Sequence, residues 1–352
     1  MNNKMRRLTD ALQENEAALI YTCVNRRYLT NFPSSLGYLL VSKKRQSLIV
    51  DGRYFEAAQK TVKNADVFLL KNTASQLKDF VRTNCIDKIL IEDEINLGTA
   101  IAVENACGCK TQGARLSRLL LEMRSIKSEQ EIEYVIAAQR IAEKALTELL
   151  NFIKPGVSEK RLVAELEYQM RLFGSDGASF DTIAVSGEKS SMPHGVPSER
   201  CVNAGEFITF DFGATVCGYH SDMTRTVAVG YADEQMKEVY SVVLAAELAG
   251  EDAAYSGKLC ADVDMAARTV IIDAGYGHCF AHSTGHGVGL EIHEYPALSA
   301  KTDSVLCCGN LVTCEPGIYL PGKFGVRTED MLYIRENGPQ NLTKFEKQLI
   351  IV

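Results

Sequence analysis

Residues 206–213 read EFITFDFG, and after a turn residues 219–229 read YHSDMTRTVAV. Both segments are rich in β-branched and aromatic residues, which is typical of strands. If the chain folds back about Val216–Cys217 without a bulge, Asp211 lies opposite Asp222. Two carboxylates that face each other in an apolar strand pair repel one another and lose hydration. The hairpin therefore predicts a positive charge between these two acids.

A second hairpin repeats this arrangement nearer the C-terminus. Residues 311–320 read LVTCEPGIYL and residues 324–333 read FGVRTEDMLY, and a fold about Gly322 places Glu315 opposite Glu329. An exposed location, which is usual for an acid in a strand, is disfavoured because apolar residues flank the acids in both hairpins. Two such pairs favour divalent cations bound between them, since a cation pairs with carboxylate oxygens and removes their repulsion.

A cluster of histidines and glycines supplies a further ligand. Residues 282–293 read HSTGHGVGLEIH, and the glycines would let the backbone approach a ligand closely. His286 added to the four acids gives five ligands, which suits two metal ions about 3.5–4 Å apart. A site rich in oxygen with one nitrogen suits manganese, cobalt or iron, with zinc as an alternative. His194, in a loop, is a candidate substrate contact.

The composition limits the class of protein. A chain of 352 residues that is 46% hydrophobic and 24% charged is long enough for two globular domains. Its formal charge of -7 gives no field that attracts nucleic acid or an anionic membrane. No stretch reaches the roughly 20 apolar residues of a membrane span, and the basic N-terminus lacks the apolar run of a signal peptide. The eleven scattered cysteines favour reduced thiols that pack as small core hydrophobes in a cytoplasmic protein.

The patterns along the chain predict an α+β protein with two domains. Residues 1–122 alternate helical and strand patterns, which indicates a smaller α/β domain with a central sheet. In residues 123–352, a capping box from Ser128 to Glu131 begins a long helix, and Ser158 caps the next helix. The other expected helices are 8–15, 53–62, 75–83, 233–251 and 261–274, and the expected strands of the first domain are 17–22, 38–41, 47–50, 67–70 and 88–92.

Seven segments resemble the pita-bread metallopeptidases, the family of aminopeptidase P, prolidase, methionine aminopeptidase and the metal-free creatinase. They follow the order of the family and are residues 179–183, 193–195, 211–213, 221–226, 282–296, 315–319 and 325–330. Residues 25–32 and 50–54 are weaker marks of the creatinase-type leading domain. The resemblance implies a C-terminal pita-bread domain, residues 123–352, preceded by a creatinase-type α/β domain, residues 1–122.

The resemblance also implies a role for each site residue. The implied metal ligands are Asp211, Asp222, His286, Glu315 and Glu329. The implied substrate-contacting or supporting histidines are His194, His282 and His293. Arg327 lies two residues before Glu329, so in a strand it shares that face and could hold a carboxylate in place.

These observations predict a two-metal exopeptidase. All five ligands are present, which disfavours creatinase chemistry and also a non-catalytic binding module of this fold. The large leading domain disfavours methionine aminopeptidase. The expected substrates are short peptides with a free N-terminus and proline second, because such a site asks for no N–H from the second residue.

The expected mechanism and assembly complete the hypothesis. Glu315 is the predicted general base, and His293, with His282, would stabilise the oxyanion. Ala297 occupies the position where prolidases often place an arginine, so aminopeptidase P activity is favoured, with Xaa-Pro dipeptidase activity and a relaxed aminopeptidase as alternatives. The family also suggests a homodimer.

Overall fold

The computed structural model describes residues 3–352 of the chain. The chain divides into two compact units between Arg124 and Ser125. The boundary expected after residue 122 falls inside helix α6 (Arg115–Ser125).

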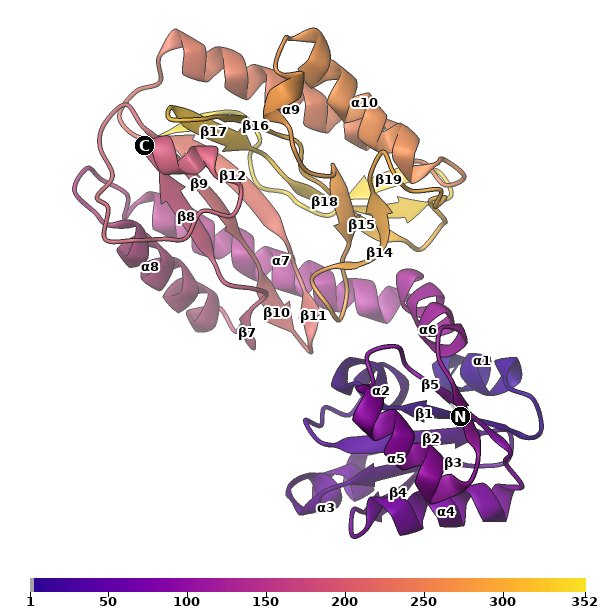
Figure 1. The fold of residues 1–352 in the computed structure, drawn as a ribbon. Helices are drawn as coiled ribbons and strands as arrows, with labels where there is room; N and C mark the ends of the chain where they lie inside the picture. Colours follow the sequence, from indigo (N-terminus) through magenta and orange to yellow (C-terminus); the bar gives the residue numbers. More distant parts are fainter. Residues whose placement is uncertain (1–2) are drawn as a thin grey trace. The chain divides into compact units, whose positions relative to one another are not determined.

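The first unit is built on a mixed six-stranded sheet in the order β4-β3-β2-β1-β5-β6 (Figure 1). The expected strands are all present with ends that differ by at most two residues, and β2 and β3 form an antiparallel hairpin. The helix expected over residues 8–15 instead spans Asn3–Ala11, because the Glu16 carboxylate accepts a hydrogen bond from the Gln13 amide and the chain turns into β1. The sequence patterns missed α2, α5, α6 and β6. The elements before α6 are α1 (Asn3–Ala11), β1 (Glu16–Ile20), α2 (Cys23–Thr30), β2 (Gly37–Ser42), β3 (Gln46–Val50), α3 (Gly52–Thr61), β4 (Asp66–Leu69), α4 (Thr73–Asn84), β5 (Lys88–Ile91), α5 (Leu97–Cys107) and β6 (Lys110–Gln112).

Two capped helices open the second unit, as the sequence predicts. Ser128 and Glu131 form the reciprocal capping box at the start of α7 (Glu129–Leu150). The Ser158 side chain accepts a backbone hydrogen bond at the start of α8 (Glu159–Leu172). Two later helices lie within two residues of their expected ranges and are α9 (Glu234–Ala253) and α10 (Cys260–Asp273).

Among residues 3–352, none of the helices combines the length and the apolar character that a membrane crossing needs.

A four-stranded sheet in the order β20-β12-β9-β8 lies between two layers of helices (Figure 1). Ile208, Phe210 and Phe212 of β9 pack against α7 and α8. Phe207, on the opposite face of β9, packs in a second core with α9, α10 and the hairpin β16–β17. The strands of this sheet are β8 (Ile183–Ser186), β9 (Phe207–Phe212), β12 (Met223–Ala228) and β20 (Ile350–Ile351).

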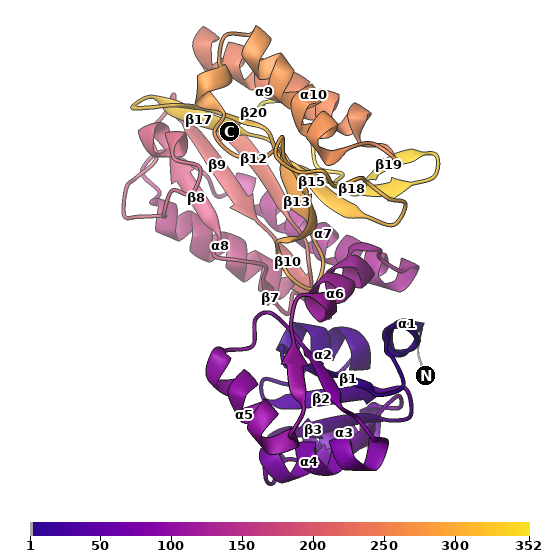
Figure 2. The same cartoon turned by 45° about the vertical axis from the view of Figure 1, so that its right-hand side comes forward.

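A second sheet runs in the order β14-β13-β15-β18-β19, and Figure 2 shows β13, β15 and β18 side by side. Three short strands form a small separate sheet, β11-β10-β7, at the end of the first hairpin. The remaining elements are β7 (Gly177–Ala178), η1 (Gly187–Ser191), β10 (Ala214–Val216), β11 (Tyr219–His220), η2 (Gly277–Cys279), β13 (Gly285–Gly287), β14 (Glu294–Leu298), β15 (Leu311–Cys314), β16 (Gly317–Leu320), β17 (Phe324–Arg327), β18 (Asp330–Arg335) and β19 (Gly338–Asn341).

The second hairpin has the register that the sequence predicts. Gly317 pairs with Arg327 in β16–β17, and Cys314 pairs with Asp330 in β15–β18. Two residues separate these pairings on each side of the hairpin. Glu315 and Glu329 therefore lie opposite each other at the break between the two strand pairs.

The first hairpin has a different register from the predicted one. Asp211 pairs with Thr224, so the chain turns about Cys217–Gly218 rather than Val216–Cys217. Both turn residues have positive φ, 50° and 76°, which is typical of a two-residue hairpin turn. The predicted pairing of Asp211 with Asp222 is wrong by two residues. A shift of two residues keeps each side chain on its face of the sheet, so the two acids are diagonal neighbours.

The cysteines carry free thiols, but most of them do not lie in the core. The expected role as small core hydrophobes holds for Cys260, Cys279 and Cys314, which are buried. It is wrong for the six exposed cysteines, which lie at helix ends and in turns and loops and are Cys23, Cys85, Cys201, Cys217, Cys307 and Cys308.

Candidate metal centre

Successive side chains of β9 point to opposite faces of the sheet, so Asp211 does not lie among its apolar neighbours. Ile208, Phe210 and Phe212 face the α7–α8 layer, so Asp211 points to the opposite face of the strand. Asp222 lies immediately before β12 and is 3% exposed. The flanking apolar residues thus cover the face of the sheet that packs on α7 and α8. The acids point away from that face.

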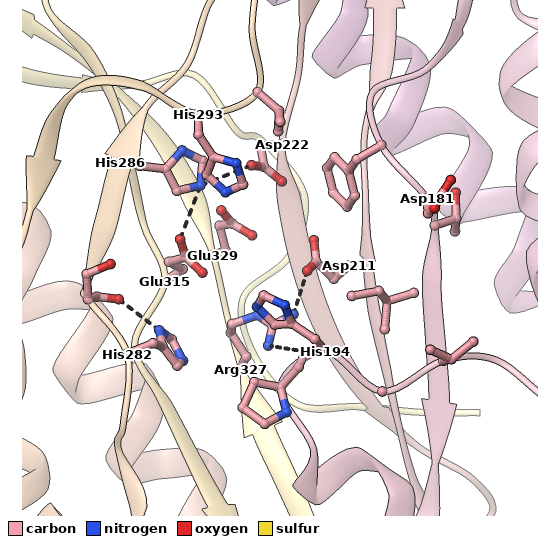
Figure 3. A pocket seen from close by; sticks show the side chains of 18 of the residues that line it. Asp181, His194, Asp211, Asp222, His282, His286, His293, Glu315, Arg327 and Glu329 are labelled. Carbon is pink, nitrogen blue, oxygen red and sulfur yellow. Dashed lines mark hydrogen bonds and ion pairs between the residues drawn. The ribbon is translucent and has the colours of Figure 1, made fainter. Parts of the chain in front are cut away.

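Backbone hydrogen bonds join Glu329 to the first hairpin and Glu315 to the segment before β13. At the break in the second hairpin, the Glu329 amide donates to the Thr224 carbonyl, 3.1 Å away. The Glu315 amide donates to the Thr284 carbonyl at 2.7 Å, next to the strand that carries His286. These contacts bring all four acids and His286 to one place (Figure 3).

His286 points its Nε2 atom at the acids. The distance from Nε2 is 3.3 Å to Glu315 Oε1 and 3.6 Å to Asp222 Oδ2. The other ring nitrogen, Nδ1, lies 3.0 Å from the Gly287 carbonyl, so Nδ1 carries the proton and Nε2 has a free lone pair. Burial lowers the pKa of His286. This is the tautomer and charge state of a metal-ligating imidazole.

The glycines around His286 lie against other parts of the protein. A Cβ on Gly285 would lie 2.0 Å from the Thr313 carbonyl oxygen, and one on Gly287 would lie 2.6 Å from the Tyr295 carbonyl oxygen. A Cβ on Gly289 would meet the Glu294 carboxylate. Gly285 and Gly287 therefore allow neighbouring backbone to approach β13, and Gly289 leaves room for the Glu294 side chain. The expected approach of this backbone to a ligand stays a prediction.

A cavity of about 670 Å³ contains every site residue that the sequence predicts. These residues are His194, Asp211, Asp222, His282, His286, His293, Glu315, Arg327 and Glu329. No individual role is predicted from the sequence for several other lining residues, which include Phe180, Asp181, Ile183 and Ile292. Figure 3 shows Asp181 apart from the other labelled acids.

The carboxylates of the pocket outnumber its positively charged groups. Burial, with the charge of the neighbouring acids, holds the pKa of Asp222 and that of Glu329 well above their usual range. Burial likewise raises the pKa of Glu315 to about 7. Four carboxylates thus share the space with one guanidinium, that of Arg327.

Arg327 holds Asp211 rather than its strand neighbour Glu329. Its NH2 atom donates to Asp211 Oδ2 at 2.6 Å. Its other nitrogens donate to Thr224 Oγ1 at 3.1 Å and to the Tyr319 hydroxyl at 2.8 Å. Burial alone would lower the pKa of Arg327, but the nearby Tyr319 and acids outweigh it and the pKa is raised. The guanidinium stays charged and fully engaged.

His282 ends a chain of hydrogen bonds that begins at Arg327. Tyr319 accepts from Arg327, and its own hydroxyl lies 2.8 Å from His282 Nε2. His282 Nδ1 lies 2.8 Å from the Ser283 carbonyl, which can only accept. Burial lowers the pKa of His282 to about 4, so the ring is neutral and its single N–H is occupied. The predicted donation from His282 to an oxyanion is therefore not available.

His293 remains the histidine beside the ligands that is free to act on a substrate. Its ring centroid lies 4.2 Å from that of His286, and its ring lines the cavity. Burial and the neighbouring His286 lower its pKa. His194 reaches the same cavity from the loop after η1.

The residues present fit divalent cations. Asp222, His286 and Glu329 can bring one ligand atom each within 4.8 Å of one another. Asp222 Oδ1 is buried and has no hydrogen-bond partner among the described residues. A buried acceptor without a partner is costly, and a set of carboxylate oxygens with one imidazole nitrogen suits a first-row divalent metal ion.

Comparison with known families defines the class of this protein. Metallopeptidase family M24 matches residues 133–336, and the Creatinase/Prolidase N-terminal domain matches residues 4–126. The chain belongs to metallopeptidase family M24. It is a metal-dependent hydrolase, in which a creatinase-type N-terminal domain precedes a pita-bread domain along the chain.

Individual relatives match over the whole length. The chain is 39% identical over 342 residues to the uncharacterized peptidase YqhT of Bacillus subtilis, with 96% of each chain covered. A solved structure of the Xaa-Pro dipeptidase from Bacillus anthracis has a TM-score of 0.96 and 40% identity, with 99% of each chain covered. That of the X-Pro aminopeptidase from Thermotoga maritima has a TM-score of 0.93 and 36% identity, and covers 99% of this chain and 100% of that one.

Proposed function

We propose that this chain is a two-metal exopeptidase that releases the first residue from peptides with proline second. The observation that carries the proposal is the convergence of four acids and His286 on one cavity. The proposed ligands are Asp211, Asp222, His286, Glu315 and Glu329. Manganese or cobalt are the proposed ions, with iron or zinc as alternatives.

The residues around the ligands have distinct proposed roles. Bound cations would polarise the scissile carbonyl and activate a water for attack. Glu315 accepts a proton from that water and returns it to the leaving nitrogen, as a general base and then a general acid. His293 donates a hydrogen bond to the developing oxyanion. The free amine of the substrate binds near Asp211 and Asp222, and His194 contacts the peptide.

The length of the substrate is the open choice within this function. The two solved relatives carry the names dipeptidase and aminopeptidase, and the first name favours the alternative of an Xaa-Pro dipeptidase. A dipeptidase must bind the free carboxylate of proline, which needs a positive partner when it is buried. Among the cavity residues, Arg327 is the single lysine or arginine, and its guanidinium is engaged by protein groups. This favours substrates that continue beyond proline.

Steady-state rates on Ala-Pro, Ala-Pro-Ala and a pentapeptide beginning Ala-Pro test the proposal. With manganese or cobalt added, we expect the longer peptides to be cut at least as well as Ala-Pro. Ala-Ala-Ala is the control for the requirement for proline. Cleavage of Ala-Pro alone would make the protein a dipeptidase, and no cleavage of any Xaa-Pro peptide would remove the proposed substrate class.

The proposal also covers the location, the oligomeric state and the domains of the protein. We propose a cytoplasmic homodimer with a leading domain of residues 1–122 and a catalytic domain of residues 123–352. Its partners are short peptides with a free N-terminus, and neither nucleic acid nor a membrane is a proposed partner. Sedimentation of the purified protein would measure the oligomeric state directly.

A further inference from the structure

One hydroxyl at the edge of the metal centre touches two charged groups. Thr224 Oγ1 lies 3.1 Å from Arg327 Nε and 2.7 Å from Glu329 Oε2. All three side chains are buried, and Thr224 is 0% exposed. Hydrogen bonds to charged groups that are shielded from water are stronger than those at the surface. This hydroxyl therefore constrains its partners more firmly than an exposed one would.

Chemistry fixes the direction of both hydrogen bonds. A guanidinium nitrogen carries a proton but cannot accept, so Thr224 Oγ1 accepts from Arg327. The hydroxyl has one proton of its own, which is then directed at Glu329 Oε2. Thr224 Oγ1 thus accepts a hydrogen bond from Arg327 and donates one to the Glu329 carboxylate, so it links the two side chains.

The backbone and the side chain of Glu329 are held by different groups. Its amide donates to the Thr224 carbonyl at 3.1 Å, and its carbonyl accepts from Arg225 NH1 at 2.8 Å. These contacts fix the position of the backbone but not the side-chain torsions. Within residues 3–352, Thr224 Oγ1 is the single protein group that hydrogen-bonds the Glu329 carboxylate. The orientation of that carboxylate depends on one hydroxyl.

The Arg327 guanidinium also hydrogen-bonds Asp211, which lies on the first hairpin. Arg327 NH2 donates to Asp211 Oδ2 at 2.6 Å. Arg327 therefore holds Asp211 directly and Glu329 through Thr224, so two carboxylates from different hairpins are oriented from one point. Groups that orient metal ligands in this way contribute strongly to metal affinity.

We propose that Thr224 is a positioning residue of the metal centre, whose hydroxyl holds the Glu329 carboxylate in the orientation that receives a cation. The proposal rests on the proposed metal centre and not on the choice of peptide substrate. It assigns a function to a residue that is neither a ligand nor a substrate contact.

Three substitutions separate the hydroxyl from the shape of the side chain. Thr224→Val keeps the volume and the β-branch and removes both hydrogen bonds. Thr224→Ser keeps the hydroxyl and removes the methyl group. Thr226→Val is the matched control, because Thr226 lies two residues further along β12, is equally buried and bonds the Arg327 backbone and Thr209 but no site carboxylate.

Calorimetric titration of chelator-treated protein with Mn²⁺ gives the decisive measurement. We expect Thr224→Val to weaken Mn²⁺ binding by roughly 10–100-fold, Thr224→Ser to bind close to wild type, and Thr226→Val to leave the affinity unchanged. Unchanged affinity in Thr224→Val would overturn the proposal, and so would equal losses in Thr224→Ser or in Thr226→Val. If Thr224→Val does not fold, Thr224→Ala replaces it with the same expected loss.

The titration also separates this proposal from the function on which it rests. Wild-type protein that binds no divalent cation would remove the proposed metal centre altogether. Wild-type protein that binds Mn²⁺ normally, together with an unaffected Thr224→Val, would remove only the role of Thr224.

Discussion

The ring nitrogens of the site histidines differ in their hydrogen-bond partners. His286 aims a free lone pair at Asp222 and Glu315, whereas both nitrogens of His282 are taken up by Tyr319 and Ser283. His293 lines the cavity beside His286 without an ion pair to the acids among the described residues. The three histidines of residues 282–293 therefore have three different sets of contacts.

The residue scale gives a first prediction, on His286 and His293. His286→Ala removes the imidazole ligand and should lower the bound metal per protein chain, measured by elemental analysis. His293→Ala should keep the metal and lower kcat by roughly 10²–10³-fold, as expected for an oxyanion donor. His278→Ala, outside the cavity, is the control for a histidine without either role. Retention of both metal and rate in the two site variants would show that these histidines are structural.

The position of Thr224 between Arg327 and Glu329 could not be predicted from sequence. Thr224 and Arg327 are 103 residues apart, and nothing in either local pattern indicates that the threonine hydroxyl meets the guanidinium. The acids proposed as ligands could be singled out in the sequence because charged residues in apolar strands conflict with their surroundings. Threonine in a strand creates no such conflict, since it is a common strand residue.

At the scale of elements, turns decided which registers could be predicted. The second hairpin turns about Gly322, whose φ of 72° suits glycine. The first turn places Cys217 at a φ of 50°, which no sequence rule assigns to cysteine, and the predicted centre was therefore one residue too early. Helix α5 was missed for another reason: Leu97 and Ile101 are 75% and 49% exposed, so apolar residues lie on more than one face and the helical pattern is lost.

Glu159, the first residue of α8, gives a prediction at this scale. Its buried carboxylate accepts hydrogen bonds from Lys189 at 2.7 Å and from the Ser186 and Ser198 amides, and so holds the segment that leads to His194. Burial raises its pKa, but these donors outweigh burial and the net pKa lies below the ordinary 4.5. The carboxylate therefore stabilises the fold above pH 4.5, and this stabilisation is lost as the pH falls through the folded-state pKa.

Glu159→Gln should lower the free energy of unfolding at pH 7 by about 3–5 kcal/mol, the usual cost of breaking a buried ion pair. The difference from wild type should shrink when urea denaturation is repeated at pH values below 4.5. Glu199→Gln is the matched control, because Glu199 pairs with Lys160 at the surface, where a pair contributes about 1 kcal/mol or less. A difference that is constant with pH would contradict the assignment to the ionised carboxylate.

At the scale of the whole molecule, a cation would join distant parts of the catalytic unit. The proposed ligands come from the β9–β12 hairpin, from β13 and from the second hairpin. Burial raises the pKa of three of the acids, Asp222, Glu315 and Glu329, and so disfavours their charged forms. The overall α+β class could be predicted, because the local helix and strand patterns and the segments that resemble the family both indicate it. The packing of the two hairpins against each other could not, because it depends on contacts between segments about a hundred residues apart.

Metal removal should therefore change stability as well as activity. A ligand present at a hundred times its Kd adds about 2.7 kcal/mol to folding, so EDTA should lower Tm and abolish activity, and added Mn²⁺ should restore both. Asp222→Asn removes a buried charge without a partner, so the metal-free variant should be at least as stable as metal-free wild type. Its Tm should respond less to Mn²⁺. Equal responses in the two proteins, followed by scanning calorimetry, would contradict the assignment of Asp222 as a ligand.

The unpartnered oxygen of Asp222 has a consequence for the protein in a living cell. A newly made chain that has not met a cation holds buried carboxylates at the expense of its own stability. Chaperones and proteases act on the unfolded fraction, and a change of about 1–2 kcal/mol alters abundance several-fold. A shortage of metal would then reduce the number of enzyme molecules as well as the fraction that is active, and supply of the ion would act as quality control on the protein.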